Sequence, residues 1–156
     1  MKKPELILIA GAIIGILMAL LNVPFHSLIT SVFLVVLGTV YLYLGFALFN
    51  EIPIRKIFNS ESYKGLGPWR IVVAAGTGLG LSQLTLGLLF ALNNYPMTRI
   101  LINCGLVVTA LMLLLALIRN SSERHRFYRA TAIRCAAFII VGVITLLVYS
   151  QQGQPA

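Results

Sequence analysis

The stretch "GILMALLNVP" at Gly15–Pro24 returns as "GLLFALNNYP" at Gly87–Pro96, and this repeat decides the expected architecture. At an offset of 72 residues, ten of the 28 positions from 15 to 42 are identical, without a gap. Leu-rich composition does not explain the coincident Gly, Asn and Pro. Because Asn is suited to ending a helix in a left-handed conformation and Pro cannot continue one, each stretch predicts a helix followed by a tight turn. The predicted turn residues are Asn22, Pro24, Asn94 and Pro96.

The composition is that of a membrane protein. Of the 156 residues, 59% are hydrophobic and only 10% are charged, and the mean hydropathy is +0.95, far from the usual mix of soluble domains. Five apolar runs approach the ~20 residues that a helix needs to cross a bilayer. Lipid offers no partner for unpaired backbone groups, which favours helices. We therefore predict an all-α, polytopic transmembrane helix bundle with five spans, at residues 5–21, 28–49, 71–92, 100–118 and 130–149.

The spans form a single integral membrane domain over residues 1–156. Both copies of the repeat start on the same side, which predicts two tandem parallel helical hairpins. Arg134 lies inside the last run and must reach back to the head groups if that helix crosses; a four-span protein with an interfacial fifth helix is the alternative. The predicted parts are repeat one at 6–49, a cytoplasmic loop at 50–70, repeat two at 71–118, a basic loop at 119–129 and a terminal span at 130–149.

The net charge of +8 is distributed as a membrane topology requires. Eleven of the twelve basic residues fall on one side of the predicted spans, and only Arg99 falls on the other. The positive-inside rule then predicts an inner (plasma) membrane protein with a cytoplasmic N-terminus and an external C-terminus. Docking of nucleic acid or protein at the basic loops is the lesser alternative, and no nucleic-acid partner is predicted. We expect anionic lipid head groups at Arg119, Arg124, Arg126 and Arg129.

Small and polar residues mark two further features of the predicted spans. Small residues four positions apart let helix backbones approach closely, within one chain or between copies. This spacing assigns helix packing to Gly11, Gly15, Gly76, Gly78, Gly80 and Ser82. Polar side chains on the third and fourth spans predict interhelical hydrogen bonds or, as the alternative, a polar path between the repeats. The path would use Gln83, Thr85 and Asn103.

The sequence offers little chemistry inside the membrane. It has no Asp, and its glutamates are expected at or outside the span ends, which removes the usual intramembrane proton carriers. His26 and His125 are expected on opposite sides of the membrane, so no metal site is predicted between them. We therefore expect no cofactor, no metal and no enzymatic activity. The four glutamates are Glu5, Glu51, Glu61 and Glu123.

The segment "LLFALNNYPMTRILINCGL" resembles the transmembrane hairpin of the L subunit of the gliding-motility and type-nine secretion motor of Bacteroidetes. The shared elements are an apolar run, an aromatic-Pro turn at Tyr95 and Pro96, and an Ile/Leu run to Gly105 and Leu106. The family usually has Gly after the proline and a glutamate in its second helix, and this chain has neither. The resemblance therefore implies a shared hairpin design and not motor activity.

These features together favour a small multi-pass inner-membrane protein. We expect it to act as a non-catalytic structural or assembly subunit of a membrane complex, with other membrane subunits or further copies of itself as partners. The alternative is a small-solute or ion transporter or channel with a polar path between the hairpin repeats. The duplication and the polar patch support the alternative, and the lack of charge within the spans weighs against it.

Overall fold

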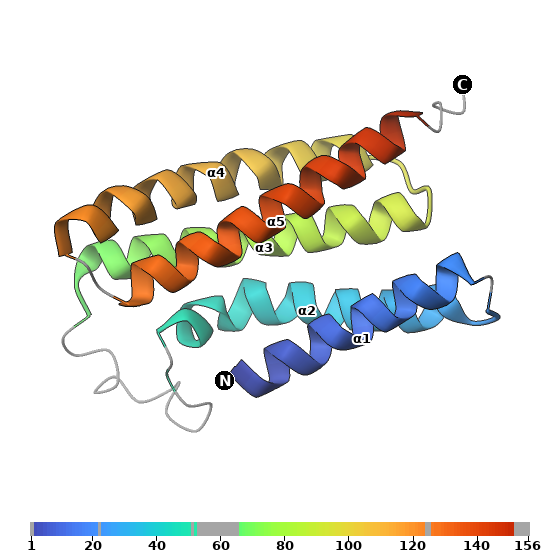
Figure 1. The fold of residues 1–156 in the computed structure, drawn as a ribbon, viewed down its shortest axis with the longest axis horizontal. Coiled ribbons are helices and arrows are strands. Elements are labelled where there is room, and N and C mark those ends of the chain that lie inside the picture. Colours follow the sequence, from blue (N-terminus) through green and yellow to red (C-terminus); the bar gives the residue numbers. More distant parts are fainter. Residues whose placement is uncertain (1, 22, 51, 53–65, 124–125, 152–156) are drawn as a thin grey trace.

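The computed structural model describes residues 2–21, 23–50, 52, 66–123 and 126–151. The described residues form five α-helices and no strand, which confirms the predicted all-α class. The helices are α1 (Lys2–Leu20), α2 (His26–Phe49), α3 (Pro68–Leu92), α4 (Thr98–Glu123) and α5 (Arg126–Gln151) (Figure 1).

The helices run up and down in a bundle with α3 at its centre. Helix α3 packs against α2, α4 and α5, while α1 packs on α2 and α4 packs on α5. Helices α1, α3 and α5 begin at one end of the bundle, which we call the basic end (Figure 1). The two short connections at 21–25 and 93–97 and the end of α5 lie at the opposite end, which we call the turn end (Figure 1).

The two connections at the turn end correspond to each other. Helix α1 ends at Leu20 and α3 at Leu92, and the following helices begin at His26 and Thr98, so both boundaries keep the 72-residue offset of the sequence repeat. The repeated stretches therefore fold into helix–turn–helix units with turns of equal length.

The backbone of both turns includes left-handed residues. Asn94 has φ 52°, in the region that Asn tolerates better than most residues. Phe25 and Met97, which occupy equivalent positions in the two turns, have φ 65° and 68°. Pro24 and Pro96 precede them in the turns, whereas Asn22 lies outside the described residues. The left-handed residues reverse the chain within a few positions.

Four helices have the length and composition of membrane spans. Helices α2, α3 and α5, and Thr98–Ser122 of α4, are long and apolar enough to cross a bilayer, so the chain is a membrane protein by these measures. The apolar part of α1, Glu5–Met18, is shorter. The span predicted at residues 5–21 therefore stays a prediction. In the sequence analysis the uncertain span is instead the last one, at residues 130–149, and α5 is long and apolar enough to cross.

The predicted basic loop at 119–129 is mostly helical. Helix α4 continues to Glu123 and α5 begins at Arg126, so residues 119–123 and 126–129 belong to helices. Apolar runs mark the part of a helix that fits in lipid, whereas backbone hydrogen bonding continues into polar residues. The sequence therefore ended the fourth helix too early and began the fifth too late. The guanidinium of Arg119 stacks on the Trp69 ring at 4.4 Å and joins the end of α4 to the start of α3. Arg124 lies outside the described residues.

The predicted packing glycines on α3 face other helices of the same chain. A Cβ at Gly78 would lie 2.6 Å from the backbone oxygen of Tyr41, so α2 and α3 approach to backbone contact there. A Cβ at Gly76 would meet the side chain of Met112, and one at Gly80 would meet Thr109, both on α4. Helix α3 therefore uses these glycines to pack against both α2 and α4.

The remaining packing residues close the first hairpin and the core. Gly11 and Gly15 of α1 lie against Phe33 and Thr30 of α2, and Ser82 of α3 is buried with 3% of its surface exposed. The main core lies in the basic half of the bundle and includes residues of α2, α3, α4 and α5. Its buried members are Leu37, Tyr41, Leu48, Phe49, Val73, Ala74, Leu81, Ala116, Phe127, Tyr128 and Ala132.

Candidate functional site

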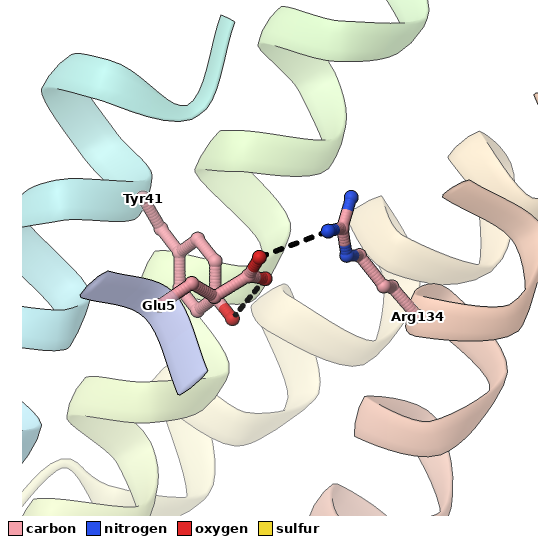
Figure 2. Close-up of polar contacts among 3 residues, drawn as sticks. All are labelled: Glu5, Tyr41 and Arg134. Carbon is pink, nitrogen blue, oxygen red and sulfur yellow. Dashed lines mark hydrogen bonds and ion pairs between the residues drawn. The ribbon is translucent and has the colours of Figure 1, made fainter. Parts of the chain in front are cut away.

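A polar cluster in the described chain lies inside the bundle and joins three helices. The Glu5 carboxylate of α1 accepts a hydrogen bond from the Tyr41 hydroxyl of α2 at 3.1 Å. Its other oxygen accepts one from Nη2 of Arg134 on α5 at 2.9 Å, which is also an ion pair. Figure 2 shows the carboxylate pointing between the tyrosine and the guanidinium. We call Glu5, Tyr41 and Arg134 the clasp.

The clasp bears on two sequence-based expectations. Glu5 lies where the apolar part of α1 begins, as expected, but its surface is only 5% exposed and it faces the bundle interior. Arg134 was expected to reach back to the head groups, but it pairs with Glu5 instead. Arg134 lies eight residues after the start of α5, which is roughly 12 Å along the helix axis. A carboxylate inside the bundle removes the need for such a reach, because the pair compensates both charges.

Aromatic rings surround the clasp. The Tyr41 ring packs edge-on to Phe138 at 5.5 Å and parallel to Phe49 at 6.3 Å, and the Arg134 guanidinium lies 5.3 Å from the centre of the Phe49 ring. The rings therefore pack against Tyr41 and Arg134, the two partners of the Glu5 carboxylate. In such surroundings a charge without its partner is costly, since desolvation is no longer offset.

The predicted polar path on α3 and α4 is not continuous. Thr85 is buried, but its hydroxyl donates to the backbone oxygen of Leu81 at 2.7 Å within its own helix. Asn103 is exposed on α4, so it does not line an interior path. The position of Asn103 along an apolar run does not show which face of the helix carries its side chain, so the sequence alone could not place it. Gln83 is partly buried, and its side-chain oxygen has no hydrogen-bond partner within the described chain.

A second polar contact joins the two hairpins at the turn end. The Ser27 hydroxyl donates to the side-chain oxygen of Asn93 at 2.8 Å, and the His26 ring hydrogen-bonds through Nδ1 to the backbone oxygen of Val23 at 2.8 Å. A small pocket of about 80 Å³ lies beside them. The turn motifs assigned Asn22 and Asn94 to the turns themselves, and the contact between the hairpins is made by Asn93, the residue before Asn94.

Within the described ranges, no group of three His, Cys, Asp or Glu side chains is arranged to hold a metal ion. Cys104 is exposed on α4, whereas Cys135 is buried on α5. The Cys135 sulfur lies 3.9 Å from the Thr77 hydroxyl oxygen. The two cysteines are not joined by a disulfide.

No family model matches this chain. Searches of the curated proteins and of the solved structures find no match either. The clasp, the outer faces of the helices and the charge distribution are the features of the chain that bear on its function.

Sequence reasoning missed the clasp, although one signal pointed to it. Arg134 stands inside an apolar run, and a charge there requires either water or a partner. Glu5 begins another apolar run on the same predicted side of the membrane. Pairing the two would have been a reasonable hypothesis. The choice of Tyr41 as third member depends on how α2 is rotated in the bundle, which apolar periodicity does not define in a helix that is apolar on all faces.

Proposed function

We propose that this chain is a non-catalytic structural or assembly subunit of a complex in the inner membrane. The observation that carries the proposal is the outward surface of the last two helices. We compare an apolar stretch of 18 residues from each helix. Only 22% of this stretch is buried within the chain in α4 and 22% in α5, compared with 44% in α2 and 56% in α3. Helices α4 and α5 thus leave a broad apolar surface for neighbouring helices or lipid.

The clasp supports a scaffold role. Both oxygens of the Glu5 carboxylate accept hydrogen bonds from the chain's own side chains. A carboxylate engaged in this way ties α1 to α2 and α5 and is not poised to take a solute or ion. Buried polar networks whose members are satisfied favour one packing arrangement over others. We therefore assign the clasp to holding the bundle in a fixed shape.

The charge distribution supports the proposed orientation. Arg126 and Arg129 are exposed on the first turn of α5, and Arg119 lies near the end of α4, all at the basic end. Arg99 lies at the turn end, at the start of α4. The positive-inside rule then favours a cytoplasmic basic end with anionic lipid head groups around it.

A photo-crosslinking amino acid tests the subunit proposal. We would place it in cells at Leu111 of α4 and Ile140 of α5, which are 53% and 61% exposed. The control position is Ala116, which is fully buried on α4. The proposal predicts a crosslinked band with a defined second membrane protein from Leu111 or Ile140 and none from Ala116. Crosslinks to lipid alone, or only to a second copy of the chain, would contradict it.

A transporter whose polar path includes Gln83, without Asn103, is the second candidate, favoured by one observation. The side-chain oxygen of Gln83 is buried without a partner in the described chain, as expected of a group that meets water or solute at times. The test is Gln83→Cys in a chain whose Cys104 and Cys135 are replaced by Ser. Labelling by a membrane-impermeant thiol reagent would favour the path, with Leu81→Cys as the buried control. No labelling would leave Gln83 with a packing role.

A further inference from the structure

An apolar groove of about 320 Å³ runs between α1 and α5. Fifteen residues line it, and only Thr85 and Thr145 among them carry polar side chains. Both hydroxyls are engaged within their own helices, because Thr85 donates to the Leu81 oxygen and Thr145 to the Val141 oxygen. A cavity whose wall offers no polar partner does not hold ordered water and is suited to an apolar ligand.

The groove is open on the side of α1 and α5. Its floor consists of buried residues such as Leu34 of α2 and Ile102 of α4, which are 2% and 1% exposed. Its rim consists of exposed residues, including Ile13 of α1 and Val141 of α5, which are 52% and 45% exposed. In a chain that spans a bilayer, the mouth of such a groove faces the hydrocarbon of the lipid.

The clasp lies at the basic end of this groove. Each of its residues is one helical turn from a residue of the lining: Ile9 follows Glu5, Phe138 follows Arg134, and Leu37 precedes Tyr41. The apolar groove thus ends at a charged pair. An occupant with an apolar tail and a polar head therefore suits it, because the tail would contact the apolar lining and the head would lie at the charged pair.

The net charge at this end favours an anionic head, because Glu5 compensates Arg134 whereas Arg126 and Arg129 add further positive charge. The Arg134 side chain is 23% exposed, compared with 7% for Glu5, so the guanidinium is the more accessible member of the pair. A guanidinium has five N–H groups, and Glu5 accepts from one of its nitrogens, Nη2. Arg126 and Arg129 add exposed positive charge one to two turns closer to the basic end of α5. Arginine donors of this kind suit the oxygens of a phosphate.

We propose that the groove binds one acyl chain of an anionic phospholipid, with the phosphate of the head group near Arg134. The lipid comes from the leaflet at the basic end. This site goes beyond the subunit role proposed above, because a subunit needs no bound lipid and a lipid-binding protein needs no partner. The two proposals therefore stand or fall on separate experiments.

Native mass spectrometry of the full chain in mild detergent tests the site, with palmitoyl-oleoyl phosphatidylglycerol as the probe. We expect one lipid to be retained per wild-type chain, and the phosphatidylcholine of the same chains to bind more weakly. Ala137→Trp fills the groove from its exposed rim and should lower lipid affinity by roughly tenfold or more. The matched control is Ala75→Trp, at an exposed position of α3 outside the groove, which should bind as the wild type does.

A second measurement locates the lipid and guards against a misfolded variant. Helix content and thermal melting of Ala137→Trp are compared with those of Ala75→Trp. Phosphatidylglycerol with a photoactivatable group in its acyl chain should then label wild-type residues of the rim, such as Ile13 and Val141. Equal lipid binding by a folded Ala137→Trp chain would overturn the proposal. Labelling confined to the outer face of α4, or a groove filled by a helix of a second copy, would also overturn it.

Discussion

Glu5 and Arg134 are stable inside an apolar bundle because each compensates the charge of the other. Their side chains meet at 2.9 Å, and the surface of Glu5 is almost completely buried. Burying either charge alone would cost several kcal/mol, because the desolvation penalty would not be offset. Tyr41 adds a donor to the second carboxylate oxygen, so that the carboxylate accepts from two helices at once. The three residues make the first helix part of the same packing unit as the last.

Replacing Tyr41 by Phe tests the third member of the clasp. The change keeps the ring between Phe49 and Phe138 but removes the donor to Glu5. A hydrogen bond to a charged group contributes about 2 kcal/mol, and we expect the free energy of unfolding to fall by about that amount. The measurement is reversible unfolding in mixed micelles, followed by circular dichroism. Tyr43→Phe on the exposed face of α2 is the control and should have no effect; equal losses for both variants would count against the hydrogen bond.

Gly78 tests the backbone contact between α2 and α3. A methyl group there would approach the Tyr41 backbone oxygen to 2.6 Å, and neither backbone can move without separating the helices. Gly78→Ala should therefore lower the free energy of unfolding by about 1–3 kcal/mol, the usual cost of overpacking. Gly67→Ala is the control, because no atom lies within 4 Å of its new methyl group and its φ is an ordinary −63°. Unchanged stability of Gly78→Ala would mean that α2 and α3 do not approach to backbone contact at this position.

The sequence predicted some of these residues and not others, for a physical reason. Small residues four positions apart identified Gly76, Gly78 and Gly80, because close approach needs small side chains whatever the partner helix is. The partners were not predictable, since they depend on how each helix is rotated in the bundle. The same limit applies to Arg134, whose position inside an apolar run was evident but whose partner lies 129 residues away.

The helical hairpins show where local signals are sufficient. Each turn is built by nearby residues, so the Asn-x-Pro pattern placed both turns within a few positions of the observed ends. The end of α4 and the start of α5, both at the basic end of the bundle, were less predictable. Hydropathy falls where the side chains reach water, whereas the helical hydrogen bonds of α4 continue to Glu123. The basic residues Arg119, Arg126 and Arg129 therefore lie on helices and not in a loop.

The two equivalent left-handed residues of the turns give a paired prediction. Phe25 and Met97 have φ near 65° and side chains that are 76% and 66% exposed, so little packing opposes their replacement. A left-handed conformation costs a residue with a Cβ about 1–2 kcal/mol, and Gly avoids this cost. Gly also makes the unfolded chain more flexible, which offsets part of this gain. Phe25→Gly and Met97→Gly should therefore each raise the free energy of unfolding by a net amount of about 1 kcal/mol.

The control for this pair is Leu28→Gly, at a position of α2 that is 65% exposed. Glycine inside a helix lowers stability, by about 1 kcal/mol relative to Ala. The turn variants and the helix variant should thus shift stability in opposite directions in the same unfolding assay. A loss of stability in the turn variants would indicate that the Phe25 and Met97 side chains contribute packing that outweighs their backbone conformation.

For the bundle as a whole, the basic end and the turn end differ in charge, and this difference predicts its orientation in the membrane. A reporter that is active only outside the cytoplasm should be active when fused at the C-terminus, because α5 ends at the turn end. The same reporter inserted after Gly67, at the basic end, should be inactive. Activity at Gly67 together with silence at the C-terminus would reverse the proposed topology. Activity at neither site would mean that both ends of the bundle face the cytoplasm.

The connection of the first and last helices through Glu5 and Arg134 is measured most directly by a double-mutant cycle. Glu5→Leu and Arg134→Leu each leave a buried charge without its partner, and each should lower the free energy of unfolding by about 3–5 kcal/mol. The chain with both substitutions leaves neither charge, so it should be more stable than either single variant. If instead the two losses simply add in the double variant, Glu5 and Arg134 do not interact, and the clasp that joins α1 to α5 does not exist.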